Sequence, residues 1–103
     1  MTTWNRVAGD TGDVLDAFLE GITDLSLATS VVGHVWHGTE TPVTVTGSIV
    51  SAPLRQVRLN IGTFLGSAVP RTYKLEFQVE FPAGPVTWPE GPPDEIRVRA
   101  QGA

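Results

Sequence analysis

The sequence predicts an all-β domain, an antiparallel sandwich of about seven short strands. Apolar and polar residues alternate with a period of two in several short runs, and no segment keeps a helical period over a useful length. The chain has 11 glycines and 8 prolines among its 103 residues, a composition typical of many turns. Turn-rich segments separate the runs at close spacing, which indicates antiparallel strands with no helix between them.

Seven runs are expected to form the strands: residues 13–20, 30–38, 42–50, 56–62, 73–81, 85–88 and 95–100. The first run is apolar on both faces and fits a well-covered strand. A helix is the alternative there, because Leu15, Phe18 and Leu19 also fit a helical spacing. The second run is expected to bury Val35 and Trp36, like the buried strand tryptophan of many sandwiches. In the third run Val43, Val45, Gly47 and Ile49 share one face.

The later runs show the alternation more clearly. Residues 56–62 place Val57, Leu59 and Ile61 on one face, and in YKLEFQVEF (73–81) every odd residue is apolar and every even one polar. The short run at 85–88 is expected to pack its final tryptophan inward. The side chains expected in the core are Leu15, Phe18, Val35, Trp36, Val57, Leu59, Ile61, Tyr73, Leu75, Phe77, Val79, Phe81, Trp88, Ile96 and Val98.

The length favours a single domain, with a sandwich core at residues 9–99, an N-terminal arm at 1–8 and a C-terminal tail at 100–103. There is no cysteine, so packing or assembly rather than disulfides must stabilise the fold. The start of the chain lacks the basic and apolar regions of a signal peptide, and no apolar run reaches membrane-spanning length. We therefore expect a soluble protein with no membrane partner.

The formal net charge is -4, and it is unevenly distributed. Residues 1–50 carry one basic and six acidic side chains, whereas residues 51–103 carry six basic and five acidic ones. This asymmetry can favour head-to-tail contacts between copies, but charge pairing within one domain is the favoured interpretation. No basic patch stands out, so nucleic acid is not an expected partner.

Two groups of polar residues are candidates for metal ligands. His34 and His37 are three residues apart, a spacing that places them on opposite faces of a strand, and there is no cysteine to complete a zinc site. Asp10, Asp13 and Asp16 lack the alternating ligand spacing and the terminal glutamate of a calcium loop. The GDTG segment is better interpreted as a turn in which Asp10 bonds main-chain amides. No metal is expected.

No catalytic residue, cofactor or enzymatic activity is expected either. The chain has serines but no Gly-x-Ser-x-Gly motif, and its carboxylates are scattered over turns and outward strand positions rather than paired. It also lacks a phosphate-binding loop and a dinucleotide-binding motif.

The candidate partner-binding residues lie in the arm and in the loop at 89–95: Thr3, Trp4, Asn5, Arg6, Pro89, Pro92 and Pro93. A tryptophan in a polar arm can fold back onto its own domain or anchor in a pocket of a neighbouring subunit, and both alternatives stay open. The proline-rich loop is either a plain connection or a contact surface with little conformational entropy to lose.

The order of features resembles the small immunoglobulin-like domains of tailed-phage tail tips, in particular the N-terminal domain of phage baseplate upper proteins. The positions that carry the resemblance are Gly9, Asp10, Asp24, Leu25, Tyr73, Gly84, Thr87, Pro89, Ile96 and Val98. The resemblance spans residues 9–98 and implies an immunoglobulin-like sandwich. Baseplate upper proteins continue into further domains that this sequence lacks, so a stand-alone minor virion protein is expected.

Two classes of function follow. The first is a non-enzymatic structural protein of a tailed-phage virion, assembled in the host cytoplasm. It would be a minor tail or baseplate component that contacts other virion proteins, in several symmetric copies or as a homo-oligomer. A capsid decoration protein on the phage head is a close variant. The second class is a carbohydrate-binding β-sandwich module, which requires at least two solvent-facing aromatic side chains on one surface.

Overall fold

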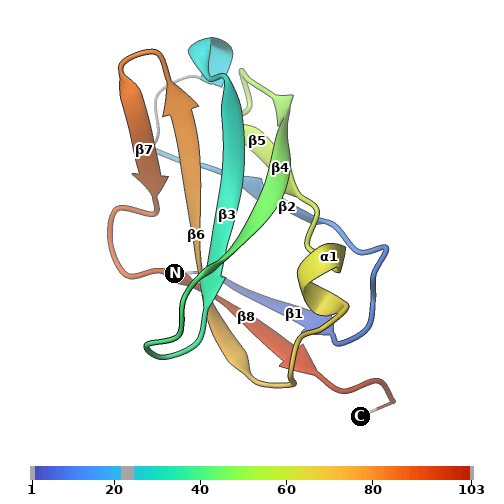
Figure 1. The fold of residues 1–103 in the computed structure, drawn as a ribbon. Coiled ribbons are helices and arrows are strands. Elements are labelled where there is room, and N and C mark those ends of the chain that lie inside the picture. The colour runs from blue at the N-terminus through green and yellow to red at the C-terminus, as the bar shows by residue number, and fades with distance from the viewer. Residues whose placement is uncertain (1, 22–24, 103) are drawn as a thin grey trace.

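The computed structural model describes residues 2–21 and 25–102 and confirms the prediction of an all-β chain (Figure 1). The strands are β1 (Thr3–Val7), β2 (Leu15–Phe18), β3 (Ser30–Trp36), β4 (Val43–Ser51), β5 (Gln56–Leu59), β6 (Thr72–Phe81), β7 (Gly84–Trp88) and β8 (Asp94–Arg99). One turn of α-helix, α1 (Gly62–Leu65), and one 3-10 turn, η1 (Leu25–Leu27), complete the described elements. Each of the seven predicted runs overlaps a strand. No helix in these residues is long and apolar enough to cross a membrane.

Hydrogen bonds join the strands into one curled sheet with the order β1-β8-β6-β3-β4-β5-β2, and β7 pairs with β6 beside this path. All pairs are antiparallel except β1 with β8, which is parallel. Strand β4 changes partner along its length: Val43–Thr46 pair with β3, and Gly47–Ser51 pair with β5. The sheet therefore continues around the core through β4, and the two separate sheets of the predicted sandwich are not confirmed.

Close packing across the curl depends on two glycines. A Cβ added at Gly33 would lie 2.6 Å from Leu59 Cδ1, so the β5 side chain rests directly on the β3 backbone. A Cβ added at Gly47 would lie 2.8 Å from the Arg58 carbonyl oxygen, at the point where β4 changes partner. The core fills this curl, and its buried apolar side chains are Leu15, Ala17, Leu19, Leu25, Val31, Val35, Val45, Val57, Leu59, Ile61, Phe64, Leu65, Tyr73, Leu75, Phe77, Val79, Ile96 and Val98.

The prediction of an N-terminal arm is wrong for most of its length. Thr3–Val7 form β1, which pairs in register with β8 from Thr3 opposite Glu95 to Val7 opposite Arg99. Trp4 lies on the inner face with its ring 6.3 Å from that of Phe77, so burial of its apolar surface favours a docked strand over a free arm. Beyond β8, residues 100–102 lie outside the strands.

Two side chains expected in the core lie elsewhere. Phe18 is 52% exposed, because in β2 the alternate residues Leu15 and Ala17 point inward. Trp36 is half-buried on the outer face of β3, since neighbouring strand residues face opposite sides and Val35 occupies the inner one. Phe81 and Trp88 are partly buried and pack against the core. Asp24, one of the positions in the phage resemblance, lies outside the described residues.

Helix α1 was not predicted. It lies in the connection between β5 and β6 and buries Phe64 and Leu65, and Gly62 at its start lies directly against the Thr11 main chain. The Gly62 amide also donates to the Asp13 carbonyl at 2.9 Å. This packing leaves a concave surface between α1 and the first half of β4.

Candidate functional site

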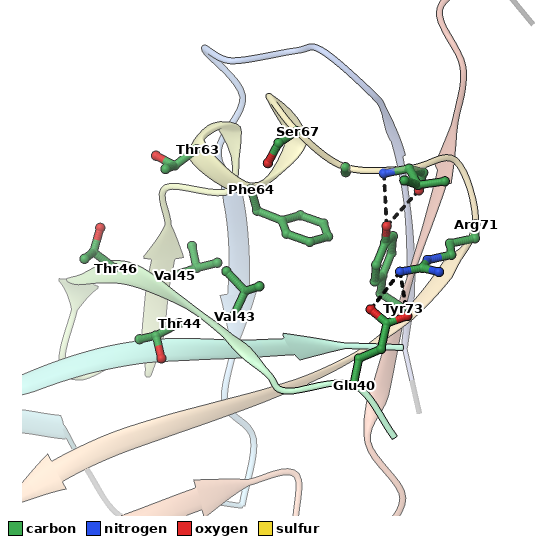
Figure 2. Close-up of a pocket in the computed structure, with 12 residues that line it drawn as sticks. Glu40, Val43, Thr44, Val45, Thr46, Thr63, Phe64, Ser67, Arg71 and Tyr73 are labelled. Carbon is green, nitrogen blue, oxygen red and sulfur yellow. Dashed lines mark hydrogen bonds and ion pairs between the residues drawn. The ribbon is translucent and has the colours of Figure 1, made fainter. Parts of the chain in front are cut away.

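The corner pocket lies between the first half of β4, α1 and the segment that leads into β6 (Figure 2). Its volume is about 450 Å³, within the range of ligand-binding clefts. Its lining residues are Glu40, Val43, Thr44, Val45, Thr46, Thr63, Phe64, Ser67, Ala68, Val69, Arg71 and Tyr73. Most of these lie on elements that the alternation of β-strands does not reveal, which explains why the sequence pointed to none of them as a site.

The β4 wall of the corner pocket is an unpaired strand edge. The Thr46 carbonyl accepts a hydrogen bond from the Asn60 amide at 2.9 Å, so the Thr46 main-chain groups face β5. Every second residue of a strand directs its main-chain groups to the same side, so the Thr44 amide and carbonyl also face away from β3. No described residue lies beside Thr44 to form a main-chain hydrogen bond there. At Thr44 the pocket thus offers a main-chain donor and a main-chain acceptor to a ligand.

The charged and phenolic groups of the corner pocket are already engaged with each other. Arg71 Nη2 lies 2.9 Å from Glu40 Oε1, and the Arg71 guanidinium lies 5.1 Å from the Tyr73 ring centre. The Tyr73 hydroxyl donates to the Val69 carbonyl at 2.8 Å and accepts from the Val69 amide at 3.1 Å. These groups fix the shape of the wall. They leave the pocket with little net charge to attract an ion.

Apolar side chains form the rim and floor of the corner pocket. Val43 is 49% exposed and Val69 is 57% exposed, one on each side of the opening. The rings of Phe64 and Tyr73 meet edge to face with their centres 4.8 Å apart, and Figure 2 shows the Phe64 ring pointing toward Tyr73. An extended chain segment laid against Thr44 would find apolar surface for its alternate side chains on this rim.

A second concave surface, the hairpin groove, lies where η1 meets the tip of the β6–β7 hairpin. Its volume is about 520 Å³, and none of its lining side chains is polar. They are Leu27, Phe81, Pro82, Ala83, Gly84, Pro85 and Val86. Leu27 is 71% exposed. Exposed apolar surface of this kind is typical of protein contacts, but two of its residues are prolines, which offer no main-chain donor to a docked strand.

The predicted partner-binding residues do not line the corner pocket. Thr3, Trp4, Asn5 and Arg6 belong to β1, and Arg6 Nε lies 3.0 Å from Asp13 Oδ2. Pro89, Pro92 and Pro93 lie in the loop between β7 and β8, where Pro89 lines a shallow hollow beside Trp88. The loop and the corner pocket therefore do not act as one surface.

The histidines take part in contacts at the outer face and the β3–β4 turn. His34 Nε2 lies 2.8 Å from Gln78 Oε1, and its Nδ1 lies 3.4 Å from Thr44 Oγ1. His37 Nδ1 lies 3.6 Å from Glu40 Oε1. The structure does not bring the two histidines together at one site.

Asp13 and Asp16, two of the candidate calcium ligands, are separated as well. Asp13 pairs with Arg6, while Asp16 accepts two hydrogen bonds from Arg58 at 2.7 and 3.0 Å. The hydrogen bonds and charge of Arg58 hold the pKa of Asp16 below its ordinary value. Within residues 2–21 and 25–102, no three His, Asp or Glu side chains are grouped so that they could hold a metal ion.

Comparisons of this chain with protein-family models, with curated proteins and with solved structures found no match.

Proposed function

We propose that this chain is a non-enzymatic structural protein of a tailed-phage particle, a minor tail or baseplate component that acts through protein–protein contacts. The partner would be another virion protein that lays an extended segment along the Thr44 edge of β4 in the corner pocket. The order of sequence features from Gly9 to Val98, which resembles tail-tip domains, supports the phage assignment. The unpaired Thr44 edge supports the mode of contact.

The Thr44 edge is the observation on which the contact depends. Addition of a strand to a sheet edge gains affinity from main-chain hydrogen bonds and specificity from pockets for alternate side chains. Here both are present, because the Thr44 main chain is flanked by the apolar rim at Val43 and Val69. The edge is short, so a single contact would be weak. Repeated copies in a symmetric particle would raise the overall affinity.

Immunogold electron microscopy of intact particles tests the assignment, with an antibody raised against the full chain. Gold at the tail end is the expected result. Gold over the head would move the protein to the alternative role of capsid decoration, with the same edge available for contacts in the head lattice. The absence of gold from particles on which an antibody to a known virion protein labels well would refute a virion role.

A further inference from the structure

The two ends of the curled sheet, β1 and β2, border a groove that is separate from both surfaces described above. Near one end of β1 the ion pair between Arg6 and Asp13 ties the strand to the loop before β2. Farther along, between Trp4 and Phe18, the two strands form no pair and the surface opens. This seam groove has a volume of about 310 Å³ and is lined by Thr2, Trp4, Asp16, Ala17, Phe18, Glu20 and Trp88.

Three aromatic rings line the seam groove. Trp4 and Trp88 are partly buried and meet Phe77 edge-on, with ring centres 6.3 and 5.6 Å from it, so their positions are fixed by the core. Phe18 lies on β2 with half of its surface exposed. Partly buried aromatic side chains held rigidly in a groove are the usual anchors of a binding site.

The polar groups of the seam groove are mostly committed within the protein. The Trp88 indole N–H donates to the Glu20 carbonyl at 2.9 Å, and the Asp16 carboxylate receives both hydrogen bonds from Arg58. The Glu20 carboxylate, by contrast, has no hydrogen-bond or ion-pair partner among the described residues. A ligand therefore meets aromatic rings beside Glu20, whose carboxylate is uncommitted among the described residues.

The charge of this region is negative. An adjoining hollow shares Glu20 and Trp88 with the seam groove and adds Glu90, and no lysine or arginine is among the described residues that line either concavity. Aromatic rings and a carboxylate together complement a cation, and a planar guanidinium can both stack on a ring and bond a carboxylate with two N–H groups.

We propose that the seam groove binds an arginine side chain presented by a partner protein, with the guanidinium against the aromatic rings and paired with Glu20. The groove and the corner pocket lie on different elements, so this inference does not depend on the proposed phage role. A neutral sugar would use the rings but would leave the Glu20 charge without a partner, so the charge favours a cationic ligand.

The test is a titration of the full chain, labelled with ¹⁵N, with the peptide acetyl-Gly-Arg-Arg-Gly-amide. The indole N–H signals of the three tryptophans report the site, because Trp4 and Trp88 line the groove whereas Trp36 lies on the outer face of β3. The matched control peptide carries citrulline in place of arginine, which keeps the shape and removes the charge. The arginine peptide is expected to shift the Trp4 and Trp88 signals and to leave Trp36 unchanged.

Two variants test whether the Glu20 carboxylate contributes to binding. Glu20→Gln is expected to weaken arginine binding about tenfold, because hydrogen bonds between charged groups are the stronger class. Glu76→Gln removes a carboxylate from the outer face and is expected to leave binding unchanged. Equal shifts with the citrulline peptide, no shift with either peptide, or shifts with cellohexaose but not with arginine would each overturn the proposal. The last outcome would assign the groove to a glycan.

Discussion

Two proline substitutions at neighbouring positions of β4 should have very different effects on stability. Thr44 directs its amide to the open corner pocket, whereas Val45 directs its amide to β3, where it lies opposite Gly33. Proline has no N–H, so Val45→Pro breaks the β3–β4 ladder and Thr44→Pro removes a donor that has no partner. The comparison therefore measures directly whether the edge is unpaired.

The expected magnitudes follow from the loss of a ladder hydrogen bond and from the fit of the proline ring. Val45 is 3% exposed and pairs with Gly33 of β3, and a proline there should lower the free energy of unfolding by about 3 kcal/mol or more. Thr44 is exposed, and a proline there should lower it by less than about 1 kcal/mol. Thr44→Ala and Val45→Ala correct for the loss of each side chain.

Guanidinium-induced unfolding followed by tryptophan fluorescence measures these free energies, and amide hydrogen exchange gives an independent check. The Thr44 amide should exchange rapidly and the Val45 amide slowly, because only the second is bonded within the sheet. If Thr44→Pro cost as much as Val45→Pro, or if the Thr44 amide were strongly protected, the edge would be paired and the proposed docking site would not exist. A stable Thr44→Pro chain that still joined the particle would refute strand addition at this edge.

The remaining predictions concern stability. Tyr73→Phe removes both hydrogen bonds to the Val69 main chain and should lower the free energy of unfolding by about 1–3 kcal/mol; an unchanged urea midpoint would show that these bonds contribute nothing. Gly62→Ala places a methyl group against the Thr11 main chain and should cost about 1–3 kcal/mol in the same assay, whereas neutrality would mean that the loop moves freely. Burial raises the pKa of Asp94 above 3.8, so its contribution to stability should be present below pH 3.8 and lost as the pH rises through the folded pKa. Between pH 3 and 6, the free energy of unfolding should therefore fall less with rising pH in Asp94→Asn than in the unsubstituted chain. The same pH dependence in both proteins would contradict this.

The local sequence pattern was sufficient to predict the strands that have one apolar face and one polar face. In β6 the odd residues face the core and the even ones face outward, and the structure follows this alternation from Tyr73 to Val79. Strand β1 gave no such signal, because Trp4 and Arg6 share its inner face and one of them is charged. Its stability comes from parallel pairing with β8 at the other end of the sequence, a contact that no local pattern encodes.

The corner pocket could not be predicted from the sequence for a related reason. The alternation of valine and threonine in β4 predicts a strand, but it does not indicate which strand pairs with each half of β4. The Thr44 edge exists because the first half of β4 pairs with β3 but has no β5 residue opposite it. Phe64 and Tyr73, which close the pocket, meet only once α1 has packed against the sheet.

The change of partner along β4 also limits what can dock there. An exposed strand edge invites uncontrolled pairing with other chains, and proteins guard against it with short edges and prolines. Here the open stretch ends on one side at Pro42, which has no N–H, and on the other at Thr46, whose carbonyl is taken by Asn60. The Thr44 amide and carbonyl lie between them, so the open stretch is short and a long strand gains few more main-chain bonds than a short one. Selection among partners must then come from the side chains that meet Val43, Val69 and the Phe64 ring, which makes the rim rather than the edge the determinant of specificity.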